Sequence, residues 1–594
     1  MEIPANDCST PKLANKCSRQ RFSALLRGCF CLLYLSFVGC GGGSEGSGGS
    51  ESGGSGGSNP RLIFSTYLGG STRCESCSSA RTFAQNAAID TRDNTYVTGG
   101  TKVSDLPVLN AWQQKPLAGS TMSAFVAKYD PAGNLLWCTY LGGNNESLGI
   151  GVAAMPDGGV AVAGLTTSDA SGPFPTMNAF QERNNGQSDY FVTVFDTGGK
   201  MKYSTYLGGS GVEGTPGVTF TDDNNSGNNI AVDARALVYL TGATNSGGGG
   251  EAIPFPVTQH AIQPKLGGST DALLSIIDPR KSGPSSLVYS SFLGGKKEEK
   301  GHAVAVNADG HNITVVGYTK SSNFPTTTNA YRSHPAPSGY ISNGFVTQFT
   351  SSLPGDSSSQ YTTRYSTYLG ADAKDARDDT YAVALDPKEL IVATGRTMSA
   401  DFPMTGPDLP SIYNSAPYLR PGKSGDEPYV VKIDPSLTGE ASLVYSTFLG
   451  GGSPTDGGET AFCTSVAVDS SGRTYVGGET SSLGVEYTPS SVPVEAPSLF
   501  PYTKDALFPA LQGEFDAVLM QISRDGVTLD YSTFFGGKEN DRTYGLAVNP
   551  FGNVVLTGLT YSSDFPLKHA AQRWPRNTGQ SNAFVARFSS LDHQ

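Results

Sequence analysis

The sequence of 594 residues has few charged side chains and no surplus of basic ones. Asp, Glu, Lys and Arg make up 16% of the residues, and the formal net charge at pH 7 is −12. A protein that binds nucleic acid without sequence preference needs a basic surface. We therefore exclude nucleic acid as a partner of this kind.

Signatures of catalysis are also missing. The six histidines are scattered, without an HExxH motif or another close metal-ligand pair, and there is no Walker A motif. Paired carboxylates at Asp222-Asp223 and Asp378-Asp379 are expected in polar loops, where such groups are most often solvated. Two loops would have to bring carboxylates together for glycosidase-type acid and base catalysis. We predict that the protein is not an enzyme and holds no cofactor and no metal.

No apolar run is long enough to cross a bilayer, which takes about 20 residues. Residues 1–39 instead have the parts of an export signal: a basic leader that ends at Arg27, the apolar run CFCLLYLSFV at 29–38, and Gly39 before Cys40. The end FVGC resembles a bacterial lipobox, in which the cysteine is lipidated and becomes the mature N-terminus. Phe37 stands where a leucine is usual. An ordinary signal peptide followed by a chance cysteine is the alternative.

A Gly/Ser tract at 41–58 follows Cys40, and we expect a flexible tether because such a tract cannot form a core. A lipidated Cys40 would anchor the exported protein in the cell envelope. Gly41 favours the outer membrane, because the aspartate that often retains lipoproteins at the inner membrane is absent. The membrane would then be contacted through the lipid alone, with the protein in the periplasm or at the surface.

The segment CESC holds Cys74 and Cys77, and no second pair stands at zinc-finger spacing. In an exported loop, a disulfide between these two cysteines is the expected outcome. Cys138 replaces the serine of a repeated phrase and is expected in the core.

Three short patterns recur along the chain from residue 62. A phrase of the form YSTYLGG, a tight hairpin such as AVDSSGRTYVGGET at 467–480, and a strand such as SAFVAKYD at 123–130 follow one another in each repeat. Each repeat therefore supplies four short strands in a meander. The seven copies of the phrase start at Phe64, Trp137, Tyr203, Tyr289, Tyr365, Tyr445 and Tyr531.

Large residues on both faces of the phrase, such as Tyr203 and Tyr206, predict a sheet stacked between two others. The repeat region begins with the phrase but ends at AFVARF (583–588) without it. A spare strand at one end and a missing strand at the other can pair and close a ring, which removes exposed sheet edges. We predict an all-β, seven-bladed β-propeller over residues 59–594, with four-stranded blades and a ring closed by the N-terminal strand. An open solenoid is the alternative.

The phrase, an AVD…GNVYVTGxT-like hairpin, DFP at 401–403 and 564–566, and the DAFVAKL-like strands together resemble the SBBP repeat, a bacterial β-propeller repeat family. The similarity covers residues 62–588. The resemblance implies a propeller in an exported or surface protein, and it supplies no established catalytic residues.

Residues that recur in the repeats are expected to serve the scaffold. An Asp or Asn ends the first strand of six hairpins, and we expect it to bond turn backbone rather than calcium. These residues are Asp90, Asp233, Asn307, Asp386, Asp469 and Asn549. FP pairs are expected to anchor loops, at Phe174, Phe255, Phe324, Phe402, Phe500 and Phe565.

The connections from each hairpin to the third strand are long and differ between repeats, and a four-stranded meander places them all on one face of the ring. Variable loops on a repetitive scaffold are the usual place for binding. Aromatic side chains there could stack on sugars or anchor a protein partner. The candidates are Trp112, Tyr331, Tyr413, Tyr418, Phe500, Tyr502 and Trp574.

We therefore expect a protein-binding or scaffolding module whose partner is an envelope or extracellular protein. Binding of a carbohydrate or cell-envelope polysaccharide is the second hypothesis. A glycoside hydrolase or lyase that uses loop carboxylates is the third.

The lipobox predicts that Cys40 anchors the protein. A Cys40→Ser chain should leave the membrane fraction of the cell, because serine does not receive the thioether-linked lipid, while Ser44→Ala in the tether should change nothing. Fractionation followed by immunoblotting measures this. If Cys40→Ser protein stays with the membranes as the wild type does, lipidation is not the anchor.

Overall fold

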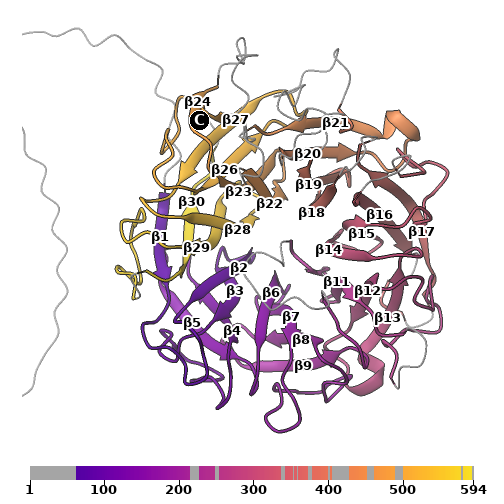
Figure 1. Ribbon diagram of the computed structural model, residues 1–594, viewed down its shortest axis with the longest axis horizontal. Coiled ribbons are helices and arrows are strands. Elements are labelled where there is room, and N and C mark those ends of the chain that lie inside the picture. Colours follow the sequence, from indigo (N-terminus) through magenta and orange to yellow (C-terminus); the bar gives the residue numbers. More distant parts are fainter. Residues whose placement is uncertain are drawn as a thin grey trace, which may run out of the picture. The chain divides into compact units, whose positions relative to one another are not determined.

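The computed structural model describes residues 62–214, 227–247, 253–335, 341–351, 354–356, 359–371, 377–398, 402–404, 427–450, 461–487, 499–576 and 579–591. They belong to one compact unit, Gly57–Gln594. In this unit, seven four-stranded antiparallel sheets, the blades, stand around a central axis (Figure 1). The predicted all-β propeller with seven blades is confirmed.

Five blades consist of four consecutive strands, counted from the axis outward. Blade 1 is β2 (Thr82–Ile89), β3 (Thr95–Thr101), β4 (Ser123–Tyr129) and β5 (Leu135–Leu141). Blade 2 is β6 (Ser147–Ala154), β7 (Val160–Thr166), β8 (Asp189–Phe195) and β9 (Met201–Leu207). Blade 3 is β10 (Ile230–Val232), β11 (Val238–Thr244), β12 (Asp271–Ile277) and β13 (Leu287–Leu293). Blade 4 is β14 (Glu299–Val306), β15 (Asn312–Thr319), β16 (Asn343–Ser351) and β17 (Tyr361–Leu369). Blade 5 is β18 (Asp378–Leu385), β19 (Ile391–Thr397), β20 (Glu427–Ile433) and β21 (Leu443–Phe448).

The last two blades depart from this simple order. Blade 6 is β22 (Ala461–Val468), β23 (Thr474–Thr480), β26 (Asp516–Ile522) and β27 (Leu529–Phe535). A small parallel pair, β24 (Gly484–Glu486) and β25 (Phe500–Tyr502), lies in its long connection. Blade 7 is β28 (Asp541–Val548), β29 (Val554–Thr560), β30 (Asn582–Phe588) and β1 (Leu62–Leu68). Two short 3-10 helices, η1 (Gly283–Ser286) and η2 (Gly439–Ser442), precede β13 and β21.

The ring is closed by the strand that comes first in the sequence. β1 is the outermost strand of blade 7 and pairs antiparallel with β30, with Thr66 opposite Val585 and Tyr67 opposite Phe584. Phe64, Tyr67 and Leu68 are at most 1% exposed, so the strand is also held by its side chains. The predicted closure by the N-terminal strand is confirmed.

The repeated phrase forms the outermost strand of every blade, and both of its faces are buried. In β9, Tyr203 and Leu207 pack into one apolar cluster with residues of β11 and β12. Tyr206 points the other way, into a cluster with Trp137 and Tyr96 of blade 1. Each blade therefore gains its core only from its two neighbours, and burial of apolar area on both faces stabilises the ring.

The Asp or Asn that ends the first strand of six hairpins holds the turn, as predicted. Asp90 Oδ1 accepts hydrogen bonds from the backbone N–H groups of Arg92 and Asn94, both at 2.9 Å. Its Oδ2 accepts one from the hydroxyl of Tyr96 at 3.2 Å. The same turn bonds are made by Asp233, Asp386, Asp469 and Asn549, and Asn307 accepts from Asn312.

Segments of the long connections pair with the outermost strands of several blades. In blade 1, Leu109 and Cys138 exchange two backbone hydrogen bonds, of 3.1 and 2.8 Å. Met177 with Ser204, and Lys568 with Ser65, form the same kind of bridge. An outermost strand would otherwise present unpaired N–H and C=O groups to solvent, which invites aggregation. The connections thus leave from one face but cover the rim.

Ring closure predicts a strong dependence on β1. A chain that begins at residue 70 should be less stable than one that begins at residue 59, because it loses the β1–β30 ladder and three buried apolar side chains. At roughly 1.5–3 kcal/mol for each side chain, the free energy of unfolding should fall by about 5 kcal/mol or more. Urea titration of both chains measures this. Equal midpoints would contradict a closing role for β1.

Candidate binding surfaces

The structure places the aromatic candidates at the rim or in the core. Trp112 and Trp574 are 42% and 76% exposed. Tyr331 is half-buried, and its backbone N–H donates to the hydroxyl of Tyr365 at 3.1 Å. Tyr502 is half-buried in β25. Of the candidates that the structure describes, only the two tryptophans present broad aromatic surfaces to solvent.

Phe500 does not belong to a binding face. It is 2% exposed, and its ring lies 4.8 Å from that of Phe534, so the core holds it. The other FP phenylalanines are at most 3% exposed, which confirms their predicted role as loop anchors. Cys40, Tyr413 and Tyr418 lie outside the described residues.

A recurring glutamine joins the long connection to the repeated phrase by hydrogen bonds in four blades. The backbone N–H of Gln113 donates to Thr139 Oγ1 at 2.8 Å, and its side-chain oxygen accepts from the N–H of Gly142 at 3.1 Å. Gln181, Gln263 and Gln572 make the same pair of bonds. The sequence contains a short motif that ends in this glutamine, as NAWQ, NAFQ, HAIQ and HAAQ. The motif is difficult to recognise because the long connections differ in length.

Cys74 and Cys77 form a disulfide in the crossing that leads into blade 1. The backbone N–H of Cys74 donates to the carbonyl of Lys102 at 3.0 Å, which ties this crossing to the start of the long connection. Cys138 is a free thiol with no exposure, as expected for a core position, and burial raises its pKa to about 12.

Pairs of buried carboxyl groups lie at three of the interfaces between neighbouring blades. Each pair is next to the first of the two glycines that end the phrase. At the first, Asp189 Oδ2 accepts from Gln181 Nε2 and from the N–H of Asn185, at 2.6 and 3.0 Å. Glu213 Oε1 accepts from Thr244 and Ser246 at 2.8 and 2.7 Å. The other pairs are Asp271 with Glu299 and Asp516 with Asp541.

The two remaining oxygens of the first pair converge on one point. Asp189 Oδ1 and Glu213 Oε2 have no other hydrogen-bond partner, and a Cβ placed on Gly208 would lie 2.4 and 2.6 Å from them. Two such oxygens can bond only through a shared proton. Burial and the charge of Glu213 raise the pKa of Asp189 to about 8, and burial also raises the pKa of Glu213.

A cluster of charged and aromatic side chains from blades 4 to 7 lies beside the axis, on the face from which the long connections leave. We call it the axial cluster: Glu298, Lys300, His302, Tyr318, Lys320, Arg377, Asp379, Tyr381, Arg396, Phe462, Glu479, Phe515 and Arg542. Four of these, Lys300, Asp379, Phe462 and Arg542, are the second residues of the innermost strands β14, β18, β22 and β28. A scaffold position would repeat, whereas this position changes from blade to blade.

Asp379 is the centre of the axial cluster. It is 3% exposed, pairs with Arg377 at 3.1 Å and with Arg396 at 3.2 Å, and accepts a hydrogen bond from Ser342 at 2.8 Å. Burial alone would raise its pKa, but Arg396 and Arg377 hold that pKa below its usual value. The guanidinium of Arg396 also lies 5.6 Å from the ring of Phe462.

The other charges of the cluster are held in the same way. Glu479 pairs with Arg542 at 3.4 Å, and Glu298 pairs with Lys320 at 3.0 Å. Burial lowers the pKa of Lys300 to about 8 and that of His302 to about 3, so the imidazole is neutral. His302 Nδ1 carries the proton, because its neighbour at 2.9 Å is the carbonyl of Thr380. A cavity of about 310 Å³, lined by Glu298, Lys300 and Tyr318 among others, lies beside the cluster.

The prediction of a solvated loop for the pair Asp378-Asp379 is wrong, because both residues are buried at the start of β18. The pair is also not arranged for glycosidase chemistry. Asp378 accepts from Thr397 at 2.5 Å and from the N–H of Ala371 at 2.9 Å, and Asp379 is held by its arginines. An acid catalyst needs a raised pKa and access to substrate, and Asp379 has neither. Asp222 and Asp223 lie outside the described residues. Within the described part of the chain, no three His, Cys, Asp or Glu side chains are grouped as metal ligands, and no helix has the length and apolarity to span a membrane.

By its strand topology the chain is a seven-bladed β-propeller. No protein-family model matches it, and no curated protein does. Among solved structures, U3-55K is 10% identical with a TM-score of 0.38, covering 89% of this chain and 99% of its own. Hydrazine synthase of Kuenenia stuttgartiensis is 10% identical with a TM-score of 0.35, covering 81% of this chain and 94% of its own. Puromycin hydrolase is 9% identical with a TM-score of 0.33, covering 83% of this chain and 53% of its own. At such identities and scores these proteins say nothing about function here.

The shared proton predicts a pH dependence. Because burial and the charge of Glu213 raise the pKa of Asp189 in the folded state to about 8, the folded protein between about pH 4 and 8 holds a proton that the unfolded chain has released. This contribution to stability is complete below pH 4 and is lost as pH rises through 8, by up to about 1.4 kcal/mol per pH unit. Asp189→Asn should flatten this fall, and Asp157→Asn, in an exposed turn of the same blade, should not. Urea unfolding at pH 5 and 8.5 measures both. An unchanged slope in Asp189→Asn would contradict the shared proton.

Proposed function

We propose that this chain is an exported, lipid-anchored propeller of the SBBP type that binds a protein partner through the face of the long connections, as a binding or scaffolding module. The export signal, the lipobox-like FVGC and the repeats support the proposed location in the cell envelope. The axial cluster is the observation that supports binding.

Residues required by the fold recur blade after blade, as the turn aspartates and the phrase do. The cluster around Asp379 does not recur, yet it places arginines against carboxylates and aromatic rings beside the axis, where the innermost strands of blades 4 to 7 begin. Arginine and aromatic side chains contribute most of the binding energy in protein interfaces. Such an arrangement costs desolvation energy that the fold itself does not require.

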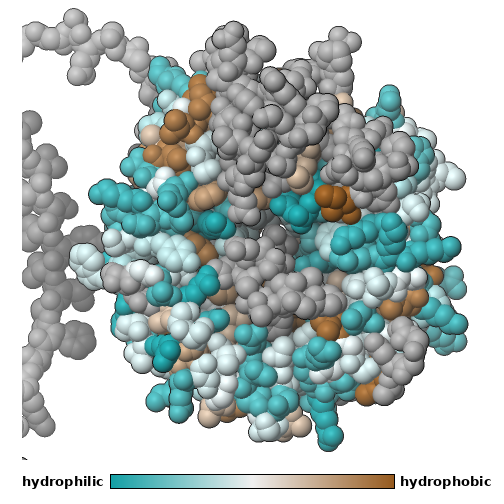
Figure 2. Space-filling view, viewed as in Figure 1, coloured by the Kyte–Doolittle hydropathy of each residue, from teal (hydrophilic) through white to brown (hydrophobic). Residues whose placement is uncertain are grey.

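Both signs of charge are present in the cluster, which fits a protein partner with charges of both signs. Figure 2 shows a mostly hydrophilic face in the coloured part of the surface, with apolar residues in small, separate groups. A partner held there would therefore be recognised mainly through polar and charged contacts around a small aromatic centre.

Carbohydrate binding is the second candidate, and the two exposed tryptophans favour it. Trp112 and Trp574 lie in long connections at the rim, where an indole can stack on a sugar ring. This site would be separate from the axial cluster.

Photo-crosslinking in cells distinguishes these surfaces. A photoreactive residue at Arg377 or Lys320, whose side chains are 45% and 38% exposed, should give a discrete protein adduct. Phe551, 80% exposed in the β28–β29 turn on the opposite face, should give none. Mass spectrometry of the adducts identifies the partner.

A third position at Trp574 tests the rim. A polysaccharide adduct from Trp574 alone would favour carbohydrate binding. No adduct from Arg377 and Lys320, or equal labelling from Phe551, would refute a protein-binding axial face.

A further inference from the structure

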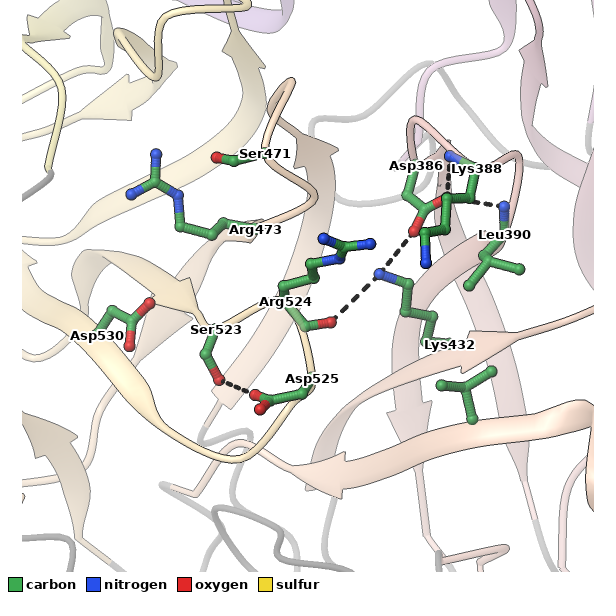
Figure 3. A pocket seen from close by; sticks show the side chains of 11 residues that line it. Asp386, Lys388, Leu390, Lys432, Ser471, Arg473, Ser523, Arg524, Asp525 and Asp530 are labelled. Carbon is green, nitrogen blue, oxygen red and sulfur yellow. Dashed lines mark hydrogen bonds and ion pairs between the residues drawn. The ribbon is translucent and has the colours of Figure 1, made fainter.

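A cleft of about 770 Å³ opens between blades 5 and 6, on the face opposite the long connections (Figure 3). Its walls come from the β18–β19 turn, from β20, and from the β22–β23 and β26–β27 turns. Turns and strands of two blades therefore meet in one depression, away from the axial cluster.

Three cationic groups are directed into the same part of this cleft (Figure 3). They are the ammonium groups of Lys388 and Lys432 and the guanidinium of Arg524. Lys432 is 2% exposed and is fixed by Asp386 at 2.8 Å and by the carbonyl of Arg524 at 3.4 Å. Lys388 and Arg524 reach in from exposed turns.

The carboxylates around the cleft already have partners. Asp386 receives Lys432 and also the backbone N–H groups of Lys388 and Leu390, at 2.8 and 2.9 Å. Asp525 and Asp530 accept from the hydroxyls of Ser523 and Thr528, both at 2.7 Å. These acids are therefore engaged in their own turns and strands.

Lys388 and Arg524 have no ion pair among the residues that the structure describes. With Lys432 they place three positive charges in one part of the cleft, where Asp386 is the nearby carboxylate. Asp525 and Asp530 also line the cleft and keep their negative charge, but they lie away from this part of it (Figure 3). Three cationic groups beside one carboxylate repel one another, and an anion that enters this part of the cleft relieves the repulsion.

We propose that this cleft binds a small anion that carries phosphate or sulfate oxygens. The planar guanidinium of Arg524 suits two parallel hydrogen bonds to such an anion, and Lys388 adds a point charge from the other blade. Lys432, held by Asp386, positions the turn of Arg524. The bound anion would bridge blades 5 and 6.

Calorimetric titration with inorganic pyrophosphate, at constant ionic strength set with chloride, tests this site on the protein from residue 59 onward, which holds every described residue. The wild type should show saturable binding. Lys388→Ala/Arg524→Ala should weaken that binding at least tenfold without changing the urea midpoint, because both side chains are exposed. Orthophosphate should bind more weakly than pyrophosphate, because it spans less of the distance between the two turns.

Lys115→Ala/Arg183→Ala is the matched control, since it removes one exposed lysine and one exposed arginine at the rim. It should bind as the wild type does. Absence of saturable binding in the wild type would overturn the proposal. So would equal affinity in the Lys388→Ala/Arg524→Ala chain, or an equal loss in the control, because either result would mean that the anion is attracted by general charge alone.

Discussion

The pairing of β1 with β30 is the interaction on which the rest of the structure depends. A blade with large side chains on both faces cannot be stable alone in water, so each blade needs a neighbour on each side. Seven such blades in a row would leave two uncovered faces and an incomplete last sheet. The strand at the start of the repeats completes that sheet, and every apolar face is then buried.

The same constraint explains the outer surface of the ring. Closure removes the uncovered faces but leaves seven outermost strands with free edges. Where the structure describes them, the long connections cover these edges with backbone bridges. The glutamine that follows Trp112 adds a further bond, because its side-chain oxygen accepts from the glycine at the end of the phrase. The variable segments are thus bound to the scaffold at fixed points. Only the parts between those points can vary for recognition.

Local interactions were predictable from the sequence, and contacts between blades were not. Asp90 accepts hydrogen bonds from the turn that it begins, and Phe174 packs under its own loop. Each of these local interactions can therefore be predicted from a short sequence motif. The spare phrase at residue 62 even predicted the closing pair. Phe500 was misassigned to a binding face because burial depends on how its loop folds back onto Phe534.

The axial cluster and the cleft could not be found in this way. Asp379 meets Arg396 across a hairpin, Arg396 meets Phe462 of the next blade, and Arg524 faces Lys388 from another blade. Such meetings depend on the placement of whole sheets around the axis. An alignment of the seven repeats, position by position, would have marked the second residue of each innermost strand as unusual, without showing what gathers there.

The position of β1 has a mechanical consequence. The segment that precedes it leads straight into the closing ladder, so a pull on the N-terminus is taken up first by the bonds between β1 and β30. The weakest response to load is then the release of one outer strand, which leaves the other six sheets complete. A chain held by its N-terminus would thus open at a defined place and could close again when the load is removed.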